Sequence, residues 1–324
     1  MEIISNPTQN EIKRAAKALK DGHLVAFPTE TVYGLGADAT NEKAVSRIYS
    51  VKGRPTDHPL IVHISSINLL EKWAIDIPDY AIKLANEFWP GPMTLILRKS
   101  SLAKDFITGG QNNVGIRVPD QPVAQLLLKE FENLGGLGIC APSANKFGAV
   151  SPTDAQAVLE EIGPSMDSSD LILDDGFCKI GIESTIIDCT KPEPKILRSG
   201  FITQEHITQL LNINSKIESK NTIKHSGNFQ SHYSPKAEIF INKSPKTGQG
   251  LIALSSIKTP EGVIRLCRPN NNVEYAHQLY SSLRKADNLG LKVISIFLPD
   301  GTGIGESIID RINKAAAKAF NLTE

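Results

Sequence analysis

The side chains best suited to chemistry gather early in the chain, between residues 27 and 63. Hydroxyl groups follow a short apolar run there, and two cations, Lys52 and Arg54, flank Gly53 just before a proline. Lysine supplies a point charge, and arginine supplies a planar fork that matches phosphate oxygens. The segment therefore predicts a rigid basic corner that suits a polyphosphate, although a Lys-Gly-Arg run taken alone is more often a solvated surface turn. The sequence contains no G-x-x-x-x-G-K-[ST] run, so a nucleotide would be bound without a P-loop.

Further polar groups stand beside predicted strands. Arg117 lies on a short predicted strand, and it could clamp a carboxylate or form a structural salt bridge; the residues alone favour neither. Ser143 and Asn145 follow a buried strand, where ligands of α/β proteins tend to bind, but an ordinary Ser/Asn turn is the alternative. Ser151 precedes a helix, either as its N-cap or as an anion contact at the helix N-terminus.

The pattern alone favours structural roles for four other polar residues. His63 lies in an apolar strand, where a hydrogen-bonded core histidine is the usual case. Ser184 begins an alternating, half-buried strand, and Arg198 ends a later strand as an exposed arginine. Tyr233 lies in a Ser-His-Tyr-Ser-Pro run and could simply anchor a polar linker.

The elements that would position these groups alternate irregularly along the first two thirds of the chain. Strands and helices mix there without a strict βαβ period, which favours a mixed, twisted α/β sheet. Thr8 and Glu11 predict a capping box at the first helix. Thr40 is the expected N-cap of a second helix that ends near Gly53.

The last third of the chain begins a new α/β pattern. Residues 212–236 are polar with few apolar anchors and predict a linker. The glycine-rich run 301–305 departs from the dinucleotide-binding spacing because Glu306 stands where the third glycine belongs, so it predicts a tight strand-to-helix turn. A length of 324 residues also favours two domains.

Composition narrows the class of protein. Hydrophobic residues make up 40% and charged residues 22%, as in ordinary globular proteins. The 35 basic and 35 acidic residues balance, which argues against non-specific coating of nucleic acid but permits a local basic patch. We expect a cytoplasmic protein with no membrane contact, since neither a spanning apolar run nor a signal peptide is present. The four cysteines lack zinc-site spacing and predict reduced thiols.

The run PTETVYGLG at 28–36, followed by KGRP, a PL dipeptide and the strand bearing His63, resembles the opening of the YrdC-like threonylcarbamoyl-AMP synthases. The length and the C-terminal half resemble the long, two-domain form of that family. The resemblance implies an N-terminal YrdC-like twisted mixed α/β domain at 1–211, a linker and active-site lid at 212–236, and a smaller C-terminal Rossmann-like α/β domain at 237–324.

The same resemblance implies a reaction in which L-threonine, bicarbonate and ATP give threonylcarbamoyl-AMP and pyrophosphate. The product would pass to a tRNA threonylcarbamoyl transferase complex for N6-threonylcarbamoyladenosine, with direct RNA contact possible. ATP would arrive with Mg²⁺, and no protein side chain would bind the metal. The implied ATP contacts are Lys52, Arg54, His58, Asn113, Ser143, Asn145, Ser151, Arg198 and Tyr233, with Lys52 and Arg54 also catalytic. The implied threonine contacts are Thr31, His63, Arg117, Ala141 and Ser184.

Three other functions compete with this hypothesis. An RNA-binding module would bind RNA in a salt-sensitive way without ATP turnover, but the neutral net charge makes it less attractive. A carbamoyl transferase that uses carbamoyl phosphate is the second alternative, and its larger relatives carry zinc fingers that this sequence lacks. A regulatory nucleotide sensor would bind ATP without releasing pyrophosphate.

Overall fold

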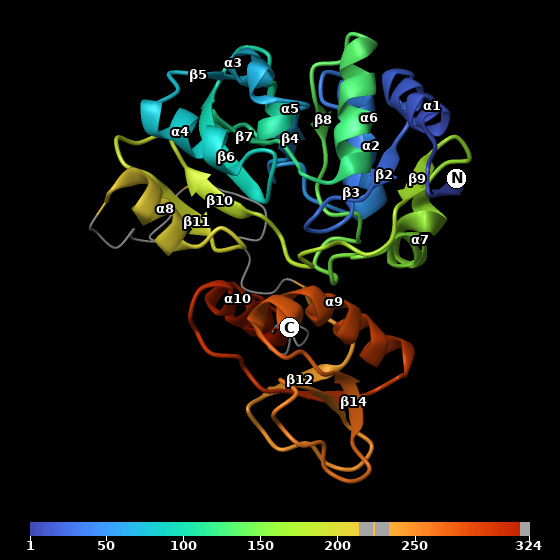
Figure 1. Cartoon of the computed structure of the whole chain (residues 1–324). Helices are drawn as coiled ribbons and strands as arrows, with labels where there is room; N and C mark the ends of the chain where they lie inside the picture. The colour runs from blue at the N-terminus through green and yellow to red at the C-terminus, as the bar shows by residue number, and fades with distance from the viewer. Residues whose placement is uncertain (214–222, 224–232, 318–324) are drawn as a thin grey trace.

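The computed structural model describes residues 1–213, 223 and 233–317, and they form two sheets with their covering helices (Figure 1). We refer to residues 1–211 as the N-terminal domain and to residues 237–317 as the C-terminal domain, a division that remains our proposal. Most of the predicted linker, and with it most of the predicted lid, lies outside the described residues.

The N-terminal domain is built on an eleven-stranded sheet in the order β1-β9-β2-β3-β8-β4-β7-β6-β10-β11, with β5 paired to β6. Parallel pairs such as β4–β7 and β6–β10 alternate with antiparallel pairs such as β3–β8 and β6–β7, which confirms the predicted mixed sheet. The strands are β1 (Glu2–Ser5), β2 (Val25–Phe27), β3 (Gly34–Asp38), β4 (Ile61–His63), β5 (Ala74–Ile75), β6 (Met93–Lys99), β7 (Asn113–Arg117), β8 (Ile139–Cys140), β9 (Leu171–Asp174), β10 (Thr185–Asp188) and β11 (Lys195–Arg198).

Helices pack on this sheet and bury one apolar face each. The capping box predicted at Thr8 is present, because Thr8 Oγ1 accepts the Glu11 N–H and the Thr8 N–H donates to the Glu11 carboxylate. The helices are α1 (Gln9–Lys20), α2 (Glu42–Lys52), α3 (Leu70–Trp73), α4 (Asp79–Phe88), α5 (Asp105–Thr108), α6 (Pro122–Asn133), α7 (Ala155–Ile162) and α8 (Gln204–Leu211), with short 3₁₀ turns η1 (Ile67–Leu69) and η2 (Gly163–Ser165).

The two ends of α2 matter for the site. Thr40 was the expected N-cap, and this was wrong: Asn41 Oδ1 accepts the Ala44 N–H instead. The Thr40 hydroxyl donates a hydrogen bond to the carboxylate of Asp38, the last residue of β3. At the other end Gly53 closes α2 with φ 63°, a left-handed conformation that glycine adopts readily. The chain therefore turns sharply between Lys52 and Arg54.

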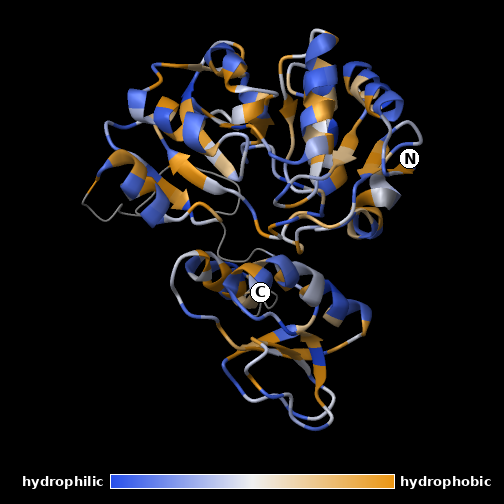
Figure 2. Ribbon diagram, viewed as in Figure 1, coloured by the Kyte–Doolittle hydropathy of each residue, from blue (hydrophilic) through white to orange (hydrophobic). Residues whose placement is uncertain are grey.

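Strand β3 is packed closely against its neighbours at Gly36. A Cβ atom added to Gly36 would lie 2.8 Å from Phe27 Cε1 and 2.9 Å from both Ile139 Cγ2 and Val25 O. Gly36 thus lets β2 and β8 approach β3 closely, and it stands in a strand rather than in a ligand loop. The apolar residues concentrate along the strands and the inner helix faces (Figure 2).

The C-terminal domain has a parallel sheet in the order β12-β15-β13-β14. Its two long helices lie between this sheet and the N-terminal domain (Figure 1). Within the run 301–305, residues 301–303 form the turn before α10, with Gly303 as its N-cap at φ 54°, and residues 304 and 305 begin the helix, which confirms the tight turn. The elements are β12 (Glu238–Ile241), β13 (Gly250–Ile252), β14 (Ile264–Cys267), α9 (Asn272–Asn288), β15 (Val293–Ile296) and α10 (Ile304–Ala316).

Together the two domains confirm the predicted fold class of a mixed α/β domain followed by a smaller α/β domain. Among the described helices, none combines the length and the apolar character needed to cross a bilayer.

Candidate active site

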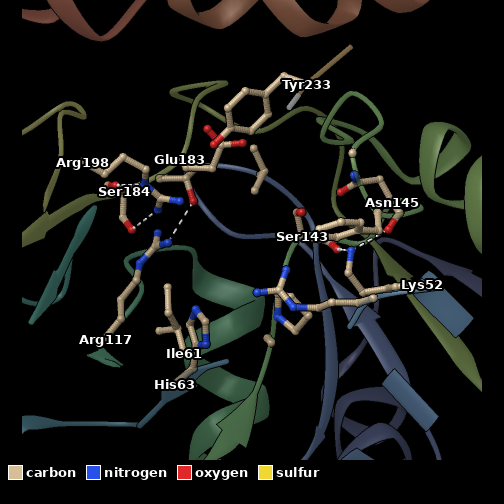
Figure 3. Close-up of a pocket in the computed structure, with 17 residues that line it drawn as sticks. Lys52, Ile61, His63, Arg117, Ser143, Asn145, Glu183, Ser184, Arg198 and Tyr233 are labelled. Carbon is tan, nitrogen blue, oxygen red and sulfur yellow. Dashed lines mark hydrogen bonds between the residues drawn. The ribbon is translucent and has the colours of Figure 1, made fainter. Parts of the chain in front are cut away.

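A polar pocket opens in the N-terminal domain (Figure 3). It lies on the side of that domain that faces α9 and α10 (Figure 1). Four cationic side chains line it, together with hydroxyl, amide, imidazole and apolar groups. The lining residues are Thr31, Val32, Lys52, Arg54, Ile61, His63, Arg117, Ala141, Pro142, Ser143, Asn145, Phe147, Gly148, Glu183, Ser184, Arg198 and Tyr233.

The pocket floor follows from strand periodicity. Side chains two residues apart on a strand share a face, so Ile61 and His63 on β4 both face the pocket. Arg117 pairs with His63 across the parallel β4–β7 ladder and therefore rises beside it. Ala141 and Ser184 stand at the ends of β8 and β10, and they complete the same face.

Lys52 and Arg54 form one side of the pocket, at the end of α2. Their side chains are buried, with only 2% and 8% of their surface exposed, so the solvated-turn alternative does not hold. Lys52 Nζ donates to the carbonyl oxygens of Ser143 and Asn145, both at 2.5 Å. Arg54 Nη2 donates to Pro59 O at 3.0 Å, and its guanidinium lies 5.8 Å from the Phe147 ring.

These two buried cations lose hydration and repel each other. Burial, followed by the Arg54 charge, lowers the pKa of Lys52 well below its usual value. Burial also lowers the pKa of Arg54 to about 10. A bound polyanion would reverse both effects, because it replaces the lost hydration with charge-assisted hydrogen bonds.

Arg117 forms the opposite side with a different set of partners. Its Nη1 donates to Thr31 Oγ1 at 3.0 Å, and its Nη2 donates to Glu30 Oε1 at 2.6 Å. The second Glu30 oxygen accepts the backbone N–H of Asp120 at 3.1 Å. These contacts fix the guanidinium plane, while Nε is buried without a hydrogen-bond partner in the described part of the chain.

Three pocket residues carry a buried polar atom that lacks a hydrogen-bond partner within the described ranges: Arg117 Nε, His63 Nδ1 and Asn145 Oδ1. Such orphan atoms are rare in folded proteins and are usually satisfied by water or ligand. Burial, reinforced by the Arg117 charge, lowers the pKa of His63 to about 3, so the imidazole is neutral at physiological pH. The pocket therefore offers a ligand unused donors and acceptors beside fixed positive charge.

Arg198 and Ser184 form a third side of the pocket, where two hydrogen bonds join them. Arg198 Nε donates to Ser184 O at 3.0 Å, and its Nη2 donates to Ser184 Oγ at 3.1 Å. Only 5% of the Arg198 surface is exposed, so the expectation of an exposed strand-end arginine was wrong. The C-terminal domain covers this corner, because α10 packs over the backbone that follows β11.

All but three of the residues predicted to bind substrate line this one pocket. His58 lies behind it, edge-on to the Phe147 ring at 5.4 Å. Asn113 begins β7 opposite Arg98, about 13 Å from Arg117 at the usual rise per strand residue. Ser151 is buried and donates to Glu183 at 2.7 Å; the N-cap of α7 is Asp154. The predicted roles of these three residues stay predictions.

Sequence reasoning assigned no role to several residues of the site. Glu30 adjoins the assigned Thr31, but only its pairing with Arg117 reveals its part. Phe147 follows the assigned Asn145 closely, and an aromatic residue just after a ligand loop was a usable signal. Glu183 precedes Ser184, and its partners lie far along the chain, so no local pattern could have identified them.

No group of three or more His, Cys, Asp or Glu side chains suited to a metal ion occurs among the described residues. In the part of the chain that the structure describes, a single carboxylate lines the pocket, that of Glu183, and it accepts hydrogen bonds from Ser151, Tyr280 and Arg311. The pocket thus presents cations and neutral donors to a ligand.

Comparisons with known proteins agree with this geometry. The family model Sua5_yciO_yrdC, described as "Telomere recombination", matches residues 17–200. A second model, "Threonylcarbamoyl-AMP synthase, C-terminal domain", matches residues 202–317. A threonylcarbamoyl-AMP synthase of Pyrococcus abyssi is 38% identical to this chain, over 98% of both proteins. The chain belongs to the threonylcarbamoyl-AMP synthase family.

Further members of this family match over nearly the whole chain. The threonylcarbamoyl-AMP synthase of Bacillus subtilis is 38% identical over 97% of this chain and 95% of its own. The crystal structure of P. abyssi Sua5 in complex with L-threonine superposes with a TM-score of 0.86 at 36% identity, covering 98% of this chain and 97% of that one. The match confirms that the resemblance seen in residues 28–63 extends to both domains of the family's long form.

Proposed function

We propose that this protein is an L-threonylcarbamoyladenylate synthase, a nucleotidyltransferase that converts L-threonine, bicarbonate and ATP into threonylcarbamoyl-AMP and pyrophosphate. The observation that carries the proposal is the pocket itself. Four buried cations, Lys52, Arg54, Arg117 and Arg198, face one cavity of a protein with no net charge. Lys52 and Arg54 on one side of the pocket and Arg117 on the opposite side suit one substrate with several phosphates and another with a carboxylate.

The cationic side of the pocket at the end of α2 and the sheet floor can each be assigned to one substrate. We assign the ATP phosphates to Lys52 and Arg54, with Ser143 and Asn145 beside them (Figure 3). We assign the amino acid to the sheet floor, where the free Nε of Arg117 would bind its carboxylate. Thr31, His63, Ala141 and Ser184 would enclose the rest of that substrate. The crystal structure of the P. abyssi relative with L-threonine supports a threonine site on this fold.

The chemistry then needs no protein nucleophile. The threonine amine combines with bicarbonate to form a carbamate, and one water molecule leaves. A carbamate oxygen attacks the α-phosphorus of ATP, the bond to the β-phosphate oxygen breaks, and pyrophosphate leaves. Lys52 and Arg54 would stabilise the negative charge that develops on the phosphates, and the fixed orientation of both substrates would supply much of the rate.

The neutral state of His63 suits this scheme. A cationic imidazole beside Arg117 would repel the threonine ammonium group, whereas a neutral one can accept a hydrogen bond from it. We therefore place His63 next to the amine or hydroxyl of threonine. Mg²⁺ would enter as part of the ATP complex, held by phosphate oxygens. The adenylate would feed the N6-threonylcarbamoyl modification of tRNA in a downstream transferase complex, and we propose a cytoplasmic location.

The test is a mass-spectrometric and pyrophosphate assay of the full chain with ATP, Mg²⁺, bicarbonate and L-threonine, omitting each component in turn. The proposal expects threonylcarbamoyl-AMP and pyrophosphate only from the complete mixture. Pyrophosphate without threonine, or turnover of carbamoyl phosphate in place of bicarbonate, would assign a different reaction. Tight, salt-sensitive RNA binding with ATP untouched would replace the enzyme by an RNA-binding function.

A further inference from the structure

Glu183 lies where the two domains meet, immediately before Ser184 of the pocket. Its carboxylate is buried and accepts three hydrogen bonds from three separate segments. The donors are Ser151 Oγ at 2.7 Å, Tyr280 Oη at 2.9 Å and Arg311 Nε at 3.0 Å. Two of these donors belong to α9 and α10 of the C-terminal domain, so this acid links that domain directly to the pocket wall.

Arg311 contacts the wall at a second point. Its side chain is fully buried, and Nη2 donates to Ser199 O at 2.9 Å while Nη1 contacts Asp310 at 2.7 Å. Ser199 directly follows Arg198, as Glu183 directly precedes Ser184. The two contacts of Arg311 therefore bracket the Arg198–Ser184 hydrogen bonds on both strands. Ser307 of α10 adds a hydrogen bond to Gly200 O at 3.0 Å.

The position of Arg198 depends on the balance of charge around Glu183. Burial would raise the pKa of Glu183, but the charges of Arg311 and Arg198 outweigh it and hold that pKa at about 2. The carboxylate is therefore an anion, and its nearest cations are one arginine from each domain. Without Arg311 the anion would be left with Arg198, and the guanidinium that faces the pocket would be drawn toward Glu183.

Two stacked tyrosines extend this interdomain contact to the pocket, because one of them, Tyr233, lines it. The Tyr233 and Tyr280 rings stack at 5.6 Å between centroids, with 26° between their planes. The Arg311 guanidinium lies 5.6 Å from the Tyr233 ring. Tyr233 lines the pocket, although its backbone has φ 63°, which non-glycine residues seldom adopt. The C-terminal domain thus contacts this side chain on two sides.

We propose that Glu183, Tyr280 and Arg311 form an interdomain latch that positions Arg198, Ser184 and Tyr233 for catalysis, which makes the C-terminal domain a working part of the active site. This inference rests on the proposed synthase function. Latch residues are positioning residues, because they act on the substrates through the side chains that they hold.

The first test compares Arg311→Met with Ile312→Ala in the full chain, at a temperature where both variants are folded. Ile312 is the next residue on α10 and is buried in the C-terminal core, so its truncation destabilises the same domain without touching the latch. The latch predicts that Arg311→Met lowers kcat roughly 100-fold, the scale of a misplaced reacting group. Ile312→Ala should keep kcat within about threefold, because it leaves the hydrogen bonds of Glu183 with Tyr280 and Arg311 in place and so should couple little to the pocket. Equal kcat in the two variants would overturn the proposal.

A second pair of variants, on α9, removes only one hydroxyl group each. Tyr280 and Tyr275 are both fully buried, and each hydroxyl donates one hydrogen bond, to Glu183 and to Phe297 O respectively. Tyr280→Phe should lower kcat by about tenfold, the lower end of the range for one lost hydrogen bond to a charged group. Tyr275→Phe should leave kcat unchanged. A loss of similar size in both would mean that the hydroxyls only stabilise the domain.

The double variant Glu183→Gln/Arg311→Met separates positioning from charge balance. It removes both buried charges, so thermal stability should recover relative to Arg311→Met. The latch predicts that kcat stays low, because the hydrogen bonds from Arg311 to position 183 and to Ser199 are still missing. Recovery of both stability and kcat would show that the pair only neutralises charge, and the proposal would fail.

A readout independent of turnover keeps this inference separate from the proposed function. If the wild-type protein makes no adenylate, the synthase assignment fails, and hydrogen exchange then decides the latch. Backbone amides of residues 184–188 and 198–202 should exchange at least tenfold faster in Arg311→Met than in Ile312→Ala, as expected for a locally freed segment. Equal protection in the two variants would refute the latch.

Discussion

Arg117 and His63 stand directly opposite each other on parallel strands β7 and β4. Burial, together with the permanent charge of the arginine, lowers the pKa of the histidine to about 3. This pairing places a neutral imidazole and a fixed cation on the same sheet face, and it leads to a testable dependence of stability on pH.

We expect His63 to make the folded protein sensitive to mild acid. In the unfolded chain the imidazole binds a proton near pH 6.5, but in the folded protein it does not until about pH 3. Stability is therefore unaffected above pH 6.5 and falls as the pH drops through the window between 6.5 and 3. Between pH 7 and pH 5 the loss should be about 2 kcal/mol. Urea unfolding of the wild type and of His63→Gln at both pH values tests this, since the variant should lose about that much less.

Replacing Arg117 should affect one substrate selectively. Arg117→Lys keeps the charge but loses the planar fork, so we expect the KM for threonine to rise about tenfold or more, the range of one charge-assisted hydrogen bond. The KM for ATP should change by less than about threefold, because Lys52, which Arg54 follows at the end of α2, lies across the pocket from Arg117 (Figure 3). Steady-state kinetics with each substrate varied measures both values. An equal rise in the two KM values would remove Arg117 from the amino-acid site.

Lys52→Met should separate catalysis from stability. The buried ammonium group is costly to desolvate, so the variant should unfold at the same temperature as the wild type or higher. Adenylate formation should drop at least ~100-fold, as when one electrostatic stabiliser is lost, and we expect the same drop for Arg54→Ala. Pyrophosphate release and a thermal melt on the same samples check both points. Near-normal rates in both variants would remove the two cations from the mechanism.

Gly36→Ala should destabilise the fold through steric overlap. The new methyl group would meet the backbone carbonyl of Val25 at 2.9 Å, and a sheet carbonyl cannot move aside as a flexible side chain can. We expect a loss of roughly 2 kcal/mol in the free energy of unfolding, the typical cost of overpacking. Gly301→Ala is the matched control, because its nearest neighbour would be Ile309 Cδ1 at 3.8 Å. Urea denaturation of both variants measures the difference, and similar midpoints would contradict the steric explanation.

Local sequence patterns predicted much of the fold. The Thr8 capping box, the turn at Gly53 and the strand that carries His63 are each set by neighbours along the chain, and the structure has all three. The N-cap prediction at Thr40 was wrong by one residue. Thr40 and Asn41 both have side chains that can cap a helix, and only the backbone conformation selects Asn41.

The site was predictable only in part. Resemblance to the family supplied most of the residues that line the pocket, but it could not show that Lys52 and Arg198 are buried. Burial depends on distant segments, such as the 143–145 loop that encloses the Lys52 ammonium. The Glu183–Arg311 contact joins positions 128 residues apart, and a single sequence carries no sign of it.

The buried ion pair between Glu183 and Arg311 also restricts natural variation. A family member made of the N-terminal domain alone would have no α10 and hence no counterpart of Arg311. Without α9 and α10 an acid at position 183 would lose Tyr280 and Arg311, which both contact its carboxylate. We therefore expect one-domain relatives to show no preference for an acid at this position. Two-domain relatives should keep the acid and the arginine together or lose them together, so the two positions should co-vary across the family.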